Sequence, residues 1–373
     1  MVKEPIQSVM KKSISARLEY IDGLKVIMIL CVLLCHLPGY SEIEPSHLWP
    51  ELGGAGVSGF IILSGFGLTY GLLTKNVTNI RVIPFLRQRF LRILPLYYAA
   101  IFTYLLILDL MQPANFLAHL LLVHTFFKEL SHNPGSFWFV GLIVQCYLFF
   151  PFAYKILLKN KGLFVLNISA ICLYILGILL AALGLYVADS FLSFVIEFVL
   201  SINIAVNAYT KKMNQYIALP IIIFTAIELT CFIISMETSF IYDLSDYMRQ
   251  SITTFSRICF FMIFLNVFLL LEQHWENYKR LVTVLSAMGF ASYSVYLFHR
   301  PLLTILIRGS VWNWFFHQIS SKDLKFIALA VVSFPLIFLI IYWIQTAHDS
   351  LQKNFFFTQF NSSRNRIQVG QND

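Results

Sequence analysis

Long apolar stretches dominate this chain and restrict its fold more than any other feature. A helix of about 20 apolar residues crosses the roughly 30 Å hydrocarbon core of a bilayer. We expect ten such spans, at about 24–40, 54–73, 93–111, 137–154, 163–187, 190–209, 216–235, 251–271, 281–307 and 325–346. The pattern predicts an all-α, polytopic helical bundle that is integral to a membrane.

The composition supports this fold class. Hydrophobic residues make up 58% of the 373 residues and charged residues only 12%, with a mean hydropathy of +0.73. Soluble domains carry about 25% charged residues. The chain is therefore not expected to be a soluble enzyme, and its six cysteines, which lie within the expected spans, are interpreted as small core residues rather than as disulfides or a metal site.

Lysine and arginine residues gather on one side of the expected spans. With the amino terminus in the cytoplasm, the inner segments hold most of them, and the outer loops hold only Lys128, Arg249, Arg308, Lys322 and Lys325. The positive-inside rule then places both termini in the cytoplasm. The net charge of +8 suits anionic lipid headgroups, and no nucleic-acid partner is expected.

The chain divides into three parts on this interpretation. Residues 1–16 form a cytoplasmic amino-terminal segment, residues 17–346 form the transmembrane domain, and residues 347–373 form a cytoplasmic polar tail. The tail is polar and short, so we expect it to be disordered.

Lys25 and His36 are ionisable residues in the first apolar stretch. Their spacing is close to three helical turns, which places both on one helix face about 16 Å apart. We expect His36 near the middle of the bilayer, about 18 Å from the cytoplasmic end, where an ionisable residue is a functional candidate by default. The simpler alternatives are a neutral His36 bonded to a neighbouring helix, and a Lys25 that reaches the headgroups or pairs with Asp22.

Arg89 and Arg92 stand at the cytoplasmic mouth of the third span. At this spacing they project from the same side of a helix, and two guanidinium groups there can bind phosphate bidentately. From charge alone, an ordinary basic flank of a span explains them better. Pro95 should start or kink the helix.

Other spans contain small or polar residues. Glycines and serines of segment 54–67 favour close helix packing in lipid over a broken helix. Segment 137–151 has an interfacial tryptophan and one buried amide, and segment 291–301 ends in a histidine, an arginine and a proline. The histidine by itself is more typical of helix packing than of catalysis. The residues of interest in these segments are Ser64, Trp138, Gln145, Tyr147 and His299.

Taken in order, these segments resemble the acyltransferase family 3 membrane proteins. The first-helix pattern of that family is a basic residue, ten residues and a histidine, which Lys25 and His36 match. Its third-helix pattern is two arginines three apart followed by an aliphatic residue, proline and tyrosine. That pattern is matched by Arg89, Arg92, Pro95 and Tyr97.

The resemblance spans about residues 17–346 and includes segments 63–66 and 293–299. One position departs from it. Many members that modify lipopolysaccharide carry a Trp-Ser-Leu stretch followed by two glutamates, where this chain has Trp138, Phe139 and Val140 and then only Gln145. An amide cannot supply a carboxylate, so the role of that acid cannot be transferred. In this segment the chain is similar to members of the family that are associated with exopolysaccharides and lipid-linked sugars.

The resemblance implies transfer of an acyl group, usually acetyl, from cytoplasmic acetyl-CoA or another acyl-CoA to a hydroxyl of a carbohydrate or glycolipid at the bacterial inner membrane. It implies a catalytic role for His36, with Lys25 and Asp22, and acyl-CoA binding by Arg89 and Arg92. His36 would act either as a general base or as a transient acyl carrier, and both require an uncharged imidazole. No bound cofactor and no metal are expected.

A different class of protein also fits part of the pattern. A saccharide transporter or exporter would line its path with ionisable residues within the membrane, here Lys25, His36, Glu197 and Glu228. The sequence shows no inverted repeat of the kind that many transporters carry. Dependence on acyl-CoA separates the two alternatives.

Overall fold

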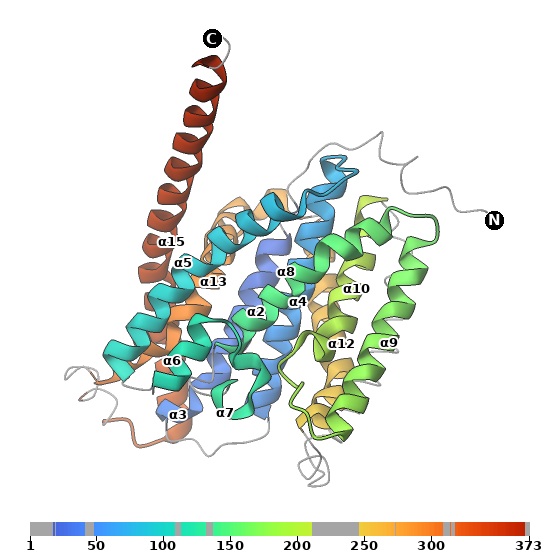
Figure 1. Cartoon of the computed structure of the whole chain (residues 1–373). Helices are drawn as coiled ribbons and strands as arrows, with labels where there is room; N and C mark the ends of the chain where they lie inside the picture. The colour runs from blue at the N-terminus through green and yellow to red at the C-terminus, as the bar shows by residue number, and fades with distance from the viewer. Residues whose placement is uncertain are drawn as a thin grey trace.

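The structure, a computed structural model, describes residues 18, 20–41, 48–108, 113–131, 137–210, 246–272, 274–308, 314 and 318–369. Within these residues every regular element is helical, as predicted, and nine helices are long and apolar enough to cross a membrane. These are α2 (Tyr20–His36), α4 (Leu48–Thr74), α5 (Val82–Leu108), α8 (Trp138–Leu157), α9 (Gly162–Ala182), α10 (Phe191–Tyr209), α12 (Asp246–Glu272), α13 (Lys279–Arg308) and α15 (Lys322–Val369) (Figure 1). The expected span 216–235, with Glu228, lies outside the described residues.

Short helices lie together at one end of the bundle (Figure 1). They are α3 (Pro38–Ser41), α6 (Pro113–Leu120), η1 (His124–Phe126) and α7 (Lys128–Ser131). We call this the outer end, because α2 runs toward it from the basic amino-terminal side, and we call the opposite end the inner end. The short η4 (Trp275–Tyr278) joins α12 to α13 at the inner end.

Glycines bring α4 close to two neighbouring helices. A Cβ atom at Gly56 would lie 2.6 Å from the Met28 carbonyl oxygen of α2, and one at Gly65 would lie 2.0 Å from Ser201 Oγ of α10. Such distances are too short for any larger residue. Since α4 is also one continuous helix, the prediction that segment 54–67 serves close helix packing is confirmed.

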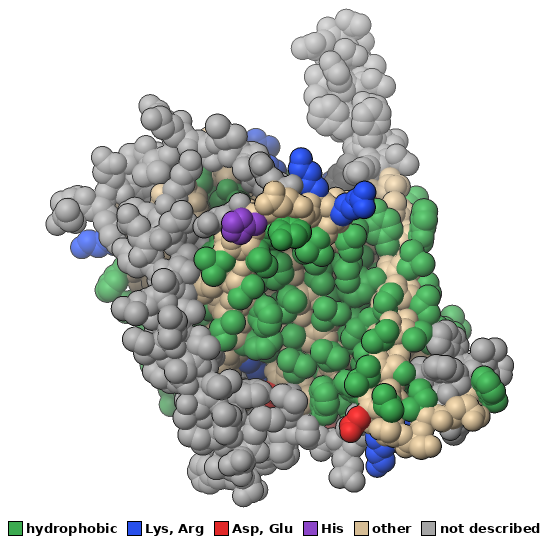
Figure 2. All heavy atoms as spheres, turned by 180° about the vertical axis from the view of Figure 1, so that it is seen from behind, with side chains coloured by type: hydrophobic (Ala, Val, Ile, Leu, Met, Phe, Trp, Pro, Cys, Tyr) green, Lys and Arg blue, Asp and Glu red, His purple; other side chains and the backbone are tan. Residues whose placement is uncertain are grey.

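Hydrophobic side chains cover the flank of the bundle. Figure 2 shows a broad face of them, with lysine and arginine side chains at its edges. Helix α9 contributes many exposed apolar residues, including Phe164, Ile168, Ile171, Ile175 and Leu179. A surface of this size is unfavourable in water but suits the acyl chains of a bilayer. The chain is therefore a multi-pass membrane protein.

The first helix begins earlier than its hydropathy indicates. α2 starts at Tyr20 rather than near residue 24, because Asp22 and Gly23 are buried against α13 and α12. His36 is consequently the last residue of α2, about 24 Å from its start. The residue therefore lies in the outer half of the bundle, and its depth in a bilayer stays a prediction.

Two other boundaries also differ from the predictions. α5 begins at Val82, so Pro95 lies inside the helix and does not start it. α15 continues to Val369, so the tail expected to be disordered is helical up to that residue. After Pro335 no proline or glycine interrupts the sequence before Gly370, which removes the usual reasons for a helix to end.

Candidate functional site

His36 of α2 lies beside His299 of α13. The two ring centroids are 4.9 Å apart and the ring planes are inclined by 31°. His299 is fully buried, and its Nδ1 donates a hydrogen bond to the Tyr296 carbonyl oxygen at 2.7 Å. Because a carbonyl can only accept, Nδ1 carries the proton, and Nε2 of the neutral ring is an acceptor. Among the described residues Nε2 has no hydrogen-bond partner, so an unpaired basic nitrogen lies beside His36.

The turn that follows α2 holds His36 in place. Pro38 begins α3, and two residues later Tyr40 Oη donates a hydrogen bond to the Arg300 carbonyl oxygen at 3.5 Å. The same hydroxyl lies 3.1 Å from Thr304 Oγ1. These contacts tie the end of α2 to α13, one turn beyond His299. The positions of the two imidazoles are therefore fixed by the packing of α2, α3 and α13.

Lys25 forms an ion pair with Asp22, which is one of the alternatives that the sequence predicted for Lys25. Lys25 Nζ lies 2.9 Å from Asp22 Oδ1, at the i,i+3 spacing of α2. The pair is near the inner end, about 16 Å along the helix axis from His36. The structure therefore brings Lys25 and Asp22 together but does not bring either to the histidine pair.

Arg89 and Arg92 lie near the inner end of α5 and differ in exposure. Arg92 is exposed, whereas Arg89 is half-buried, with its Cζ 5.5 Å from the centroid of the Phe85 ring. Arg89 Nε is buried and has no hydrogen-bond partner among the described residues. A basic flank of a span would keep its donors in water, whereas an unpaired guanidinium donor suits the oxygen of an entering phosphate.

Ser64 and Tyr147, two of the residues of interest in the sequence, meet in the bundle. Ser64 Oγ donates a hydrogen bond to Tyr147 Oη at 3.5 Å. Tyr147 is close enough to Arg89 and to Tyr293 for electrostatic interaction. Tyr293 Oη in turn donates to the Ile93 carbonyl oxygen at 3.0 Å. Helices α4, α5, α8 and α13 therefore share one polar cluster.

Polar side chains of α13 connect this cluster to the histidine pair. Tyr293, Tyr296 and His299 recur at three-residue spacing and so lie along one side of the helix. Ile93 is one turn beyond Arg89, and His299 is six residues beyond Tyr293. At 1.5 Å per residue, the distance along the bundle from Arg89 to the histidine pair is about 15 Å.

Trp138 and Gln145 organise the outer end. Gln145 Nε2 donates a hydrogen bond to Thr125 Oγ1 at 3.0 Å, and Gln145 Oε1 accepts one from the Phe191 backbone N–H at 2.9 Å. The amide therefore joins η1 to the start of α10 through α8. The Trp138 ring packs against Phe194 with a centroid distance of 5.7 Å.

A second histidine pair stabilises the short helices at the outer end. The rings of His119 and His124 stack with centroids 3.9 Å apart, and His124 Nε2 lies 3.1 Å from the Phe137 carbonyl oxygen. Burial, and to a lesser degree His119, lowers the pKa of His124 to about 3, so its ring is neutral at ordinary pH. Tyr97, part of the third-helix pattern, donates to the His119 carbonyl oxygen at 3.1 Å.

A buried ionic cluster joins α4, α10 and α12. Arg257 Nη2 lies 3.1 Å from Glu51 Oε2. Glu197 is fully buried, accepts a hydrogen bond from Ser58 Oγ at 3.4 Å and interacts with the charge of Arg257. Glu197 is thus part of helix–helix packing.

Helix α15 contributes polar residues near the inner end that were not predicted from the sequence. Ser294 Oγ donates a hydrogen bond to Gln345 Oε1, and Gln345 Nε2 donates to Asp349 Oδ1 at 2.8 Å. His348 interacts electrostatically with Asp349 and Arg92. Gln345 lies at the end of the predicted span 325–346, and His348 and Asp349 fall in the predicted tail; their helical spacing is the signal that could have indicated this contribution.

The fold and these contacts describe a polytopic membrane protein with a half-buried histidine against a fully buried one and a guanidinium donor on its inner side. A family model described as an acyltransferase domain, that of acyltransferase family 3, matches residues 18–350. The chain therefore belongs to this family of membrane acyltransferases. Comparison with curated proteins and with solved structures gives no match.

Proposed function

We propose that the protein moves an acyl group, acetyl in the first instance, from cytoplasmic acyl-CoA to a hydroxyl of a cell-surface or lipid-linked carbohydrate at a bacterial inner membrane. The observation that carries this proposal is the line of buried and half-buried polar side chains between Arg89 and the histidine pair. It provides a donor site near the inner end and a base in the outer half of the bundle.

We assign the catalytic role in this transfer to His36. The acceptor oxygen forms a bond to the thioester carbonyl carbon, the carbon–sulfur bond breaks, and the hydroxyl proton passes to the CoA thiolate. A sugar hydroxyl is a weak nucleophile at neutral pH, so its attack needs a base, and an uncharged imidazole is suited to that task. His299 is a positioning residue on this proposal, because its ring contacts His36 and is itself fixed by Tyr296.

The distance from Arg89 to the histidine pair matches the length of the pantetheine arm of acyl-CoA. The axial distance from Arg89 to the histidine pair is about 15 Å, which is the length of about four residues of extended chain. A pantetheine arm, with about a dozen bonds between its phosphate and its sulfur, has the same extent as those four residues. A phosphate held by Arg89 therefore lets the thioester approach His36. Burial of the reacting groups also limits hydrolysis of the thioester by water.

The transporter alternative has lost part of its basis. Glu197, one of the residues that suggested a translocation path, contacts Ser58 and Arg257 instead of His36. Glu228 lies outside the described residues. No described contact favours transport over acyl transfer.

Donor dependence tests the proposed function. The purified protein in lipid nanodiscs is mixed with acetyl-CoA labelled in the acetyl group and with glycans extracted from cells that lack the gene. We expect the label to enter the glycan fraction, and mass spectrometry of those cells to show an acyl increment that returns when the gene is restored. Loss of glycan export without any change in acylation would establish the transporter instead.

Replacing Arg89 with alanine should weaken donor binding. A charge-assisted hydrogen bond contributes about 1.5–3 kcal/mol, so we expect the KM for acetyl-CoA to rise about 10- to 100-fold with little change in kcat. Arg89→Lys keeps the charge but not the bidentate geometry, so its KM for acetyl-CoA should lie between that of the natural protein and that of Arg89→Ala. Arg81 is exposed just before α5, and Arg81→Ala is the matched control. An unchanged KM in Arg89→Ala would make that residue a simple basic flank.

A further inference from the structure

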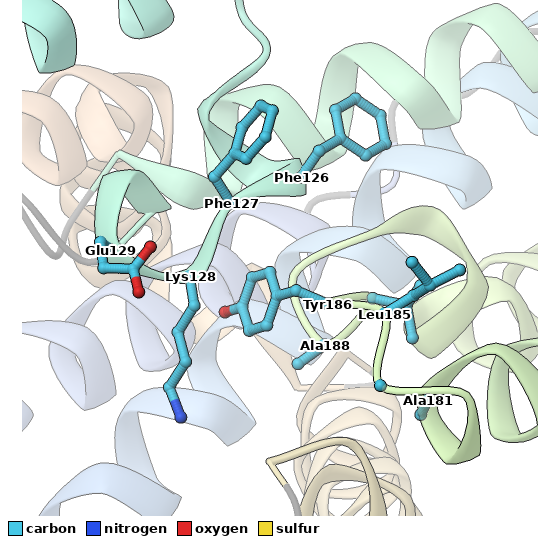
Figure 3. A pocket seen from close by; sticks show the side chains of 10 residues that line it. Phe126, Phe127, Lys128, Glu129, Ala181, Leu185, Tyr186 and Ala188 are labelled. Atoms are coloured by element: carbon cyan, nitrogen blue, oxygen red, sulfur yellow. The ribbon is translucent and has the colours of Figure 1, made fainter.

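A pocket of about 470 Å³ opens at the outer end, between the η1–α7 segment and the loop that joins α9 to α10. Figure 3 shows Phe126 and Phe127 on one side of it and Leu185 on the other, with Tyr186 between them and its hydroxyl directed toward the Lys128 side chain. The volume is within the range of about 300–1,000 Å³ that small-molecule sites occupy. The lining combines aromatic faces with charged groups of both signs.

Exposure distinguishes the aromatic residues of this pocket from core residues. Phe126 and Phe127 are 51% and 53% exposed, although both line the pocket. Lys128 and Glu129 follow them directly and are exposed as well. Large aromatic residues that are exposed beside charged residues are characteristic of a binding surface.

The two walls of the pocket are held by Gln145. Its amide nitrogen bonds Thr125, which directly precedes Phe126, and its amide oxygen bonds the N–H of Phe191, just after the α9–α10 loop. Gln145 lies on α8, a long buried helix of the bundle. Both segments that line the pocket are therefore bonded, next to the pocket, to the same side chain of α8.

A polar contact leads from the pocket toward the histidine pair. Tyr186 Oη donates a hydrogen bond to Asp189 Oδ2 at 2.5 Å. Asp189 is buried and close enough to Tyr296 for electrostatic interaction. The Tyr296 carbonyl oxygen is the group that fixes His299. The pocket and the histidine pair therefore belong to the same half of the bundle, and the electrostatic interaction of Asp189 with Tyr296 links them.

We propose that this pocket binds a sugar ring of the acceptor carbohydrate, with the ring stacked on Phe127 and its hydroxyls bonded to Lys128, Glu129 and Tyr186. The C–H groups of a sugar carry partial positive charge and match the negative face of an aromatic ring. Vicinal hydroxyls both donate and accept, so they suit neighbouring ammonium and carboxylate groups. The proposal rests on the proposed function, because it identifies the occupant as the acyl acceptor. A phospholipid headgroup is the competing occupant.

Saturation-transfer NMR on the full chain in nanodiscs tests the assignment. The probes are the methyl glycosides of glucose, galactose, mannose and N-acetylglucosamine, together with phosphorylethanolamine and glycerophosphate. The variants are Phe127→Ala, Phe127→Trp and the control Leu183→Ala, which removes an exposed side chain that does not line the pocket. Size-exclusion chromatography of each sample shows that the variants remain folded, and CoA binding is measured separately as the readout of the proposed function.

We expect at least one glycoside to receive saturation in the natural protein and in Leu183→Ala. The signal should fall at least about fourfold in Phe127→Ala and return in Phe127→Trp, since an aromatic face contributes about 1 kcal/mol or more. The proposal is overturned if no glycoside is saturated, if Phe127→Ala leaves the signal intact, or if only the phosphate-containing probes respond. Failure of the acyltransferase proposal has a different signature, namely glycoside binding that persists while CoA does not bind.

Discussion

Acyl transfer should be lost when His36 is replaced with alanine. General base catalysis contributes about 10²- to 10⁴-fold to rate, so we expect kcat in the labelled acetyl-CoA assay to fall by at least about 10²-fold. The prediction holds whether His36 removes the acceptor proton or carries the acyl group, because both mechanisms need the same imidazole. The fold should survive, since His36 is half-buried and ends its helix.

Two matched variants show whether the effect belongs to the site. His274→Ala removes an exposed histidine at the inner end and should retain full activity. His299→Gln removes the ring that contacts His36, and we expect a smaller loss in kcat, a changed pH profile and an unchanged KM for acetyl-CoA. Full activity in His36→Ala at equal membrane abundance would remove His36 from the mechanism, while a His299→Gln variant with the natural pH profile would reduce His299 to a packing residue.

The sequence predicted the helical class and the packing of α4 well, because both depend on local patterns. Apolar length sets a membrane span, and glycines at helical spacing mark a close helix contact. Helix ends were predicted less well. Tyr20 and Asp22 extend α2 beyond its apolar stretch because other helices bury them, and a hydropathy window does not register such tertiary contacts.

The site was predictable only in part for a similar reason. The i,i+3 pairing of Lys25 with Asp22 is local, and the sequence offered it as an alternative. The partner of His36 is His299, more than 260 residues later, and no periodicity joins the two helices. Gln145 is the clearest case: the sequence indicates a missing acid, whereas the structure shows both ends of the amide engaged in bonds between outer segments.

The buried ionic cluster gives the largest expected effect on stability. Arg257 pairs with Glu51 across 3.1 Å and also interacts with the charge of Glu197, and the paired side chains of Arg257 and Glu51 are only 9% and 15% exposed. Its removal leaves two carboxyl groups without their cation. Since breaking a buried pair on one side costs about 3–5 kcal/mol, we expect Arg257→Met to lower the stability of the protein by that amount.

Thermal aggregation of the detergent-solubilised protein ranks the variants, since a less stable protein aggregates at a lower temperature. Arg280→Met is the control because Arg280 is exposed at the inner end. Arg280→Met should change stability by less than about 0.5 kcal/mol. The double variant Glu51→Gln/Arg257→Met should be more stable than Arg257→Met alone, because it also removes one of the carboxylates left unpaired. If Arg257→Met melts at the same temperature as the natural protein, the ion pair of Arg257 with Glu51 does not hold α4 and α12 together.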